Sequence, residues 1–117
     1  MAYLRHWFNG QTVSVFHLGD SAIIGRHPHC AIQVDDATVS GEHARVYLGS
    51  EGYEAEDLDS TNGITVKGEK VSHCQLMDGA TFTLGTQEFE FLHELPDDLD
   101  KTLKIKKSWI PGVFFAE

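Results

Sequence analysis

Turn signals recur at short intervals along most of this chain, and they limit what it can fold into. Glycine and small polar residues mark these points, because they permit tight reversals and backbone conformations that other residues resist. The signals are Asn9-Gly10, Gly19-Asp20, Asp35-Asp36, Gly49-Ser50, Asn62-Gly63, Gly68-Glu69, Asp78-Gly79 and Gly85. A chain interrupted this often can contain only short secondary-structure elements.

The runs between the turns have the composition of β-strands. Residues 81–84 read TFTL and residues 88–92 read EFEFL, so every second side chain can face a core. Further β-rich runs lie at 12–16, 32–34, 44–48 and 64–66. No segment before residue 94 has the sustained 3.6-residue periodicity of an amphipathic helix. The pattern predicts an all-β sandwich with ten or eleven strands across residues 2–93.

Length and charge exclude several classes of protein. The 117 residues are 41% hydrophobic and 23% charged, which suits a single domain with one core. The net charge of −9 repels nucleic acid and anionic lipid, so any bound anion needs a local site. No apolar run approaches the length of about 18 residues that spans a membrane, and the N-terminal sequence MAYLRHWFNG does not resemble a signal peptide.

Two cysteines, Cys30 and Cys74, lie beside apolar or strand-like sequence. Their spacing suits neither a zinc site nor a dense disulfide framework. We interpret both as reduced thiols, with Cys30 in the core, and expect a cytoplasmic protein. The neighbouring residues His27 and His29 lack a carboxylate at a known ligand spacing, so we interpret them as part of an exposed loop and expect no metal or cofactor.

Residues 94–117 differ from the preceding domain, which we place at residues 1–93. The segment opens with an acidic cluster around Pro96, then becomes basic, and ends in apolar side chains. These are Trp109, Ile110, Val113, Phe114 and Phe115. We expect a tail or docking arm, and packing of this strip on its own domain is a simpler interpretation than a partner motif.

Four short motifs at strand ends carry the polar residues and glycines that could form a site. They are Ile23-Ile24-Gly25-Arg26, Ser40-Gly41-Glu42-His43, Ser60-Thr61-Asn62-Gly63 and Leu76-Met77-Asp78-Gly79. In a sandwich, the loops at one end form one surface. Motifs that are distant in sequence can therefore contribute to a single site.

In this order, the motifs resemble the forkhead-associated (FHA) domain family. The family pattern of Gly-Arg, Ser-x-x-His, Ser-x-Asn-Gly and a Leu-x-x-Gly turn appears here as GR, SGEH, STNG and LMDGA, within about residues 3–93. The resemblance implies an eleven-stranded β-sandwich that binds phosphothreonine peptides through loops at one end. It also implies a phosphothreonine-containing partner protein and a Ser/Thr kinase that modifies it.

The resemblance assigns a binding role to five residues. A phosphate dianion needs a cation and several hydrogen-bond donors. Arg26 would supply the cation, Ser40 and Thr61 would supply hydroxyl donors, and Gly41 would supply a backbone N–H. Asn62 carries a donor and an acceptor on one side chain, so it would hold the peptide backbone. The simpler alternatives are a surface arginine, a turn-capping serine and an Asn-Gly hairpin turn.

Three further residues of the motifs, Gly25, His43 and Gly63, would shape the loops rather than touch the ligand. Two positions depart from the family. Gly41 offers only its backbone, where many members carry a side chain that helps to bind phosphate. Thr38 stands where some members place a long basic residue that reads an acid three places after the phosphothreonine, so we expect little preference for acidic peptides.

Two other classes of function are possible. Ser40, His43 and Asp57 or Asp59 could form a hydrolase triad. However, no Gly-x-Ser-x-Gly elbow accompanies the serine, and its three-residue separation from the histidine is unsuitable, so we expect no catalysis. A phosphate-independent interaction domain in a signalling or secretion assembly is a stronger alternative. Gly41 favours it, whereas the other four binding residues count against it.

Thr102 is a candidate phosphorylation site in the tail. It follows an acidic cluster, and Ile105 lies three residues later, where some FHA domains prefer an aliphatic residue in their ligands. Phosphorylated Thr102 could bind the site of its own domain or that of a second molecule, which would cause self-association. A solvated connector is the simpler interpretation.

Overall fold

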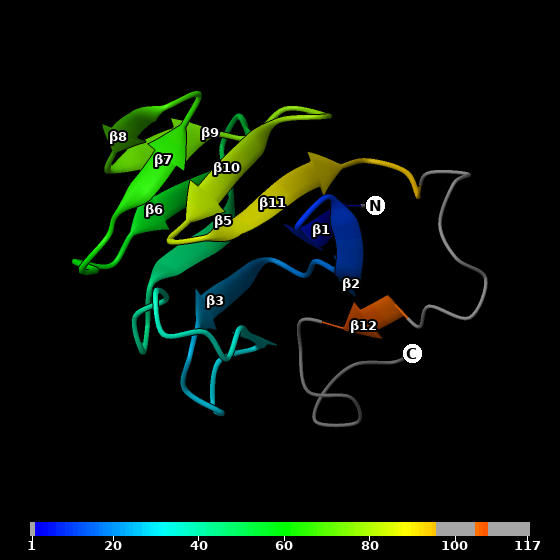
Figure 1. Ribbon diagram of the computed structural model, residues 1–117. Coiled ribbons are helices and arrows are strands. Elements are labelled where there is room, and N and C mark those ends of the chain that lie inside the picture. Colours follow the sequence, from blue (N-terminus) through cyan, green and yellow to red (C-terminus); the bar gives the residue numbers. More distant parts are fainter. Residues whose placement is uncertain (1, 96–104, 108–117) are drawn as a thin grey trace.

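A computed structural model describes residues 2–95 and 105–107 of the chain. Every element in these residues is a strand (Figure 1). The strands are β1 (Tyr3–Phe8), β2 (Gln11–His17), β3 (Ser21–Gly25), β4 (Ile32–Gln33), β5 (Ala44–Gly49), β6 (Gly52–Asp57), β7 (Ile64–Val66), β8 (Glu69–Val71), β9 (His73–Gln75), β10 (Thr81–Leu84), β11 (Gln87–Leu92) and β12 (Ile105–Lys107). The first eleven confirm the all-β class and the strand number predicted for residues 2–93.

The strands form two sheets that enclose one core. The larger sheet has the order β12-β2-β1-β11-β10-β7-β8, and the smaller has the order β4-β3-β5-β6-β9. The alternation of TFTL and EFEFL is confirmed, because Phe82, Phe89 and Phe91 are all buried in the core cluster. Cys30 is also buried, as predicted, and it and Cys74 are free thiols whose pKa values are raised chiefly by burial.

Two-residue turns set the register of the hairpins in the larger sheet. Asn9 and Gly10 join β1 to β2 with φ angles of 52° and 75°, which is the backbone of a type I′ turn. Lys67 and Gly68 join β7 to β8 with φ angles of 51° and 83°. The same conformation is less favourable at Lys67 than at Asn9, because asparagine adopts positive φ more readily than most other residues with a β-carbon.

The Asn62-Gly63 pair does not reverse a hairpin. Strand β6 belongs to the smaller sheet and β7 to the larger, so the loop between Asp57 and Ile64 crosses from one sheet to the other. Gly63 is buried with a φ of 71°, which favours glycine at this crossing. The hairpin alternative is therefore wrong for this pair. The connection is longer than a two-residue turn, so it can also carry hydrogen-bonding side chains.

Part of the predicted tail belongs to the larger sheet. Strand β12 pairs in parallel with β2, and Ile105, Lys106 and Lys107 lie opposite Val15, Phe16 and His17 (Figure 1). It occupies the edge of the sheet that β2 would otherwise expose. Thr102 lies outside the described residues, so its phosphorylation stays a prediction. No helix in the described part of the chain is long and apolar enough to cross a membrane.

Candidate functional site

Three of the four motifs meet at one end of the sandwich, where β3 ends, β5 begins and β6 ends. The backbone N–H of Arg26 donates to the carbonyl of Ser40 at 3.0 Å, and that of His27 donates to the carbonyl of Gly41 at 3.1 Å. The Ser40 hydroxyl oxygen accepts the backbone N–H of Thr61 at 3.0 Å. The SGEH loop is therefore joined to the GR loop on one side and to the STNG loop on the other. The GR, SGEH and STNG loops are called the first, second and third loops below.

His43 connects two of these loops through hydrogen bonds of its buried ring. Its side chain is buried, with 0% exposure. Its Nδ1 accepts the backbone N–H of Ser40 at 3.0 Å, and its Nε2 donates to the carbonyl of Gly63 at 2.8 Å. Because an amide N–H can only donate and a carbonyl can only accept, the ring is neutral with its proton on Nε2. His43 thus connects the second loop to the third.

Gly25 lets the first loop lie directly against the second. A β-carbon at this position would lie 2.1 Å from the carbonyl oxygen of Gly41 and 2.8 Å from the sulfur of Cys30. Neither distance is compatible with van der Waals contact, so a side chain would push the two loops apart. The glycine of the GR motif is thus required by close approach, and not by an unusual backbone angle.

Ser60 shapes the third loop, a role that the sequence analysis did not assign. Its hydroxyl donates to the carboxylate of Asp57 and accepts the backbone N–H of Gly63 at 2.8 Å. The Asp57 carboxylate also accepts the backbone N–H of Ser60 at 3.3 Å. An aspartate followed three residues later by a serine is a local turn signal that could have suggested this arrangement.

Asn62 and Thr38 meet across the site through the backbone of Thr38. The Asn62 Nδ2 donates to the Thr38 carbonyl at 2.8 Å, which leaves the amide oxygen and one N–H of the side chain for other partners. The Thr38 hydroxyl instead bonds to the carboxylate of Asp36 and accepts the backbone N–H of Thr86 at 3.0 Å. The Thr38 hydroxyl bond is the largest cause of the lowered pKa of Asp36. The side chain of Thr38 thus connects the loop between β4 and β5 to the turn between β10 and β11.

Several donor groups at this end have no partner among the described residues. Arg26 is exposed, and its guanidinium has no hydrogen bond or ion pair in the part of the chain that the structure describes. Thr61 and Asn62 are exposed in the third loop, which the Thr61–Ser40 hydrogen bond joins to the second. Because the Ser40 oxygen accepts the N–H of Thr61, its own proton is free to point toward a ligand. An exposed cation together with neutral donors on adjoining loops is suited to bind an anion.

His27 lies where a side chain at position 41 would be. A β-carbon added to Gly41 would lie 2.5 Å from Cδ2 and 2.8 Å from Nε2 of the His27 ring. The ring also stacks on His29 at 5.1 Å between centroids, and His29 bonds to Glu42 at 2.7 Å. No three potential metal ligands gather anywhere in the described residues. The absence of a side chain at Gly41 thus makes room for the exposed ring of His27, a relation that the sequence analysis did not detect.

The hydrolase triad is not assembled. Both ring nitrogens of His43 bond to backbone groups, so neither can accept the proton of the Ser40 hydroxyl. The Asp57 carboxylate contacts Ser60 rather than His43. These contacts exclude the acid–base relay that such a mechanism needs.

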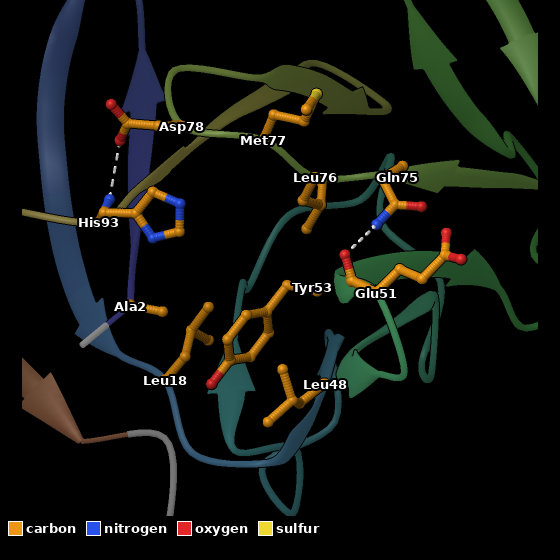
Figure 2. Close-up of a pocket in the computed structure, with 11 residues that line it drawn as sticks. Ala2, Leu18, Leu48, Glu51, Tyr53, Gln75, Leu76, Met77, Asp78 and His93 are labelled. Atoms are coloured by element: carbon orange, nitrogen blue, oxygen red, sulfur yellow. Dashed lines mark hydrogen bonds between the residues drawn. The ribbon is translucent and has the colours of Figure 1, made fainter.

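The fourth motif does not join the other three. Leu76, Met77 and Asp78 line a cavity at the opposite end of the sandwich (Figure 2). The motif precedes β10, and the chain enters that strand from the far end of the molecule. Motifs at strand ends can lie at either end of a sandwich, and their order in the sequence does not distinguish between the two ends.

Comparisons with known proteins agree with this fold. The FHA domain model matches residues 22–85. An oxoglutarate dehydrogenase inhibitor from Corynebacterium jeikeium (strain K411) is 34% identical over 74 residues, which are 63% of this chain and 51% of that protein. This chain therefore spans about half the length of that relative.

Two solved structures show the same likeness. The FHA domain of the CT664 protein from Chlamydia trachomatis is 27% identical with a TM-score of 0.72, over 80% of this chain and 98% of that one. A structure from a study of phosphothreonine-dependent FHA domain interactions is 29% identical with a TM-score of 0.67, over 81% of this chain and 98% of that one. In both cases the match includes nearly all of the neighbouring chain.

Proposed function

This chain belongs to the FHA domain family, and we propose that it binds phosphothreonine in a partner protein as a non-catalytic adaptor module. The observation that carries the proposal is the convergence of Arg26, Ser40 and Asn62 from three separate loops. Backbone and side-chain hydrogen bonds fix these loops relative to one another, whereas the Arg26 guanidinium stays unpaired in the described structure. A preorganised set of donors around a free cation suits a phosphate dianion.

Different residues of the site would bind the phosphate and the peptide backbone of the ligand. Arg26, the Ser40 hydroxyl, the Gly41 N–H and the Thr61 hydroxyl would bind the phosphate. Asn62 would bind the peptide backbone, because its free amide oxygen accepts an N–H and its remaining N–H donates to a carbonyl. A Ser/Thr kinase would have to modify the partner in the same compartment, which we expect to be the cytoplasm.

An oriented library of phosphothreonine peptides tests this proposal directly. The immobilised protein should retain phosphorylated peptides and release the matched unphosphorylated ones. Equal retention of the two sets would favour the alternative, a phosphate-independent interaction domain. The library also shows which neighbouring residues are selected. Because the Thr38 hydroxyl is engaged by Asp36 and Thr86, we expect no selection for an acidic residue three places after the phosphothreonine.

We expect phosphothreonine to bind more tightly than phosphoserine. The added methyl group can pack between the loops that carry Ser40 and Asn62. One buried methyl contributes about 0.8 kcal/mol, or about a fourfold difference in Kd. Titration calorimetry with two peptides that differ only in this residue measures the difference, and equal affinities would contradict the packing argument.

His27 should contribute to phosphate binding. Its ring occupies the space that a side chain at position 41 would fill. Its ring nitrogens make no hydrogen bond within the described residues, whereas the neighbouring His29 is paired with Glu42. A ring N–H of His27 can therefore donate to the ligand.

The comparison with His27→Ala isolates this contribution. Loss of one hydrogen bond should weaken the binding of a phosphothreonine peptide by about 0.5–1.5 kcal/mol, or about two- to tenfold in Kd. Titration calorimetry measures the difference, and unchanged affinity would show that His27 does not contact the phosphate.

A further inference from the structure

A cavity of about 770 Å³, whose lining Figure 2 shows, lies at the end of the sandwich opposite the loops that carry Arg26, Ser40 and Asn62. Two strands define the separation. Strand β5 begins next to His43 and ends at Gly49, while β6 begins at Gly52 and ends at Asp57. The turn between these strands lines the cavity, whereas their other ends hold the phosphate site. A ligand in the cavity would therefore not touch the proposed phosphopeptide.

The cavity has an apolar interior and an exposed apolar rim. Leu18 and Leu76 are buried at its base, whereas Leu48 is 50% exposed and Met77 is 71% exposed. Figure 2 shows Leu18, Tyr53 and Leu48 on one side of the opening and Leu76 and Met77 on the other. Large apolar side chains this exposed around a concave surface are typical of a docking site.

Key polar groups at the rim are already paired. The Tyr53 hydroxyl donates to the Gly19 carbonyl at 2.9 Å, and the Gln75 amide donates to the Glu51 carbonyl at 3.0 Å. The Asp78 carboxylate accepts the backbone N–H of His93 at 2.8 Å. These hydrogen bonds make the three polar groups less available to a polar ligand. The leucine and methionine side chains remain available to an apolar ligand.

Strand β12 carries the chain toward this cavity. It runs parallel to β2, and its last residue, Lys107, lies opposite His17. The residue after His17 is Leu18, which lines the cavity and donates its backbone N–H to the carbonyl of Ala2 at 2.8 Å. Lys107 therefore lies opposite the residue that precedes Leu18 of the cavity lining. Ten residues follow in this chain, and fully extended they can reach at most about 36 Å.

These ten residues, 108–117, have the composition of an apolar docking segment. They read SWIPGVFFAE, with no Lys or Arg and with two apolar groups separated by a Pro-Gly turn signal. We propose that residues 108–117 dock in the cavity of their own domain, with aromatic side chains covering Leu48 and Met77. Docking on the same chain needs no second partner, since β12 ends at Lys107, opposite His17 and one residue from Leu18 of the cavity lining.

The two tryptophans of the 117-residue chain allow a direct test. Each indole N–H gives one peak in a ¹⁵N correlation spectrum, and Trp7→Phe assigns the peak of Trp109. The proposal predicts nuclear Overhauser contacts from the Trp109 ring to the methyl groups of Met77 and Leu48. A Trp109 peak at the position of the free peptide SWIPGVFFAE, without such contacts, would overturn it.

Matched substitutions at exposed apolar positions supply the control. Leu48→Asp or Met77→Asp should move the Trp109 peak toward the free-peptide position. Phe8→Asp should leave it unchanged, because Phe8 is 40% exposed and lies outside the cavity. Movement in all three variants would contradict docking in the cavity.

Docking between two molecules is distinguished by isotope mixing. In a mixture of differently labelled chains, contacts that appear only between the two labels, together with a dimeric mass, would overturn docking on the same chain. Phosphopeptide affinity should be the same in the wild-type protein and in Leu48→Asp. This readout separates failure of the docking proposal from failure of the proposed phosphopeptide function.

Discussion

Arg26→Ala should weaken the binding of a phosphothreonine peptide by about 2–5 kcal/mol, which is roughly thirtyfold to several thousandfold in Kd. In the proposed site, the guanidinium is the charged donor, and it has no competing partner within the described residues. Its removal leaves the phosphate with neutral donors only. Titration calorimetry with one phosphopeptide measures the loss.

Two further variants calibrate this result. Arg26→Lys keeps the charge but loses the two-pronged geometry, so its affinity should lie between those of Arg26→Ala and the wild-type protein. Ser40→Ala removes one neutral hydrogen bond and should cost about 0.5–1.5 kcal/mol. An Arg26→Ala protein that binds as well as Ser40→Ala would show that the phosphate does not lie on Arg26. Folding should be unaffected, because the Arg26 side chain is exposed.

His43→Ala should reduce the free energy of unfolding by about 2–4 kcal/mol. It leaves the N–H of Ser40 and the carbonyl of Gly63 without partners, each at a cost of about 1–3 kcal/mol. Water that enters the site and bonds to these groups would reduce the loss of stability. Phosphopeptide affinity should fall as well, because the second and third loops lose their connection. Urea unfolding followed by circular dichroism measures the stability.

Conservative and surface substitutions test the physical reason. His43→Gln keeps a donor for the Gly63 carbonyl and should recover part of the loss. His29→Ala removes an exposed histidine and should change stability by no more than about 0.5 kcal/mol. If His43→Ala unfolds at the same urea concentration as His29→Ala, the hydrogen bonds of His43 do not stabilise the loops.

The fold could be predicted because its signals are local. Alternation in EFEFL places Phe89 and Phe91 on the core face whatever the neighbouring strand is. The Asn9-Gly10 pair predicts a turn for the same reason, since the two residues adopt positive φ without help from distant contacts. Asn62-Gly63 has the same local signal but joins two different sheets, and only the complete topology distinguishes the two cases.

The site was only partly predictable, since its geometry depends on contacts between loops. The motif residues Arg26, Ser40 and Asn62 could be named from their order, and the structure brings their loops together. The place of His27 depends on the missing side chain of Gly41, which no local pattern reveals. The distant position of Met77 likewise depends on which end of the sandwich its loop occupies.

One measurement tests the central claim most directly. A peptide selected from the library is prepared with threonine and with phosphothreonine, and each form is titrated into the wild-type protein by calorimetry. The phosphothreonine form should bind, and the unmodified form should show no measurable heat of binding at the same concentrations. Equal affinity for the two forms would contradict a phosphate-dependent site at Arg26 and support a phosphate-independent interaction domain.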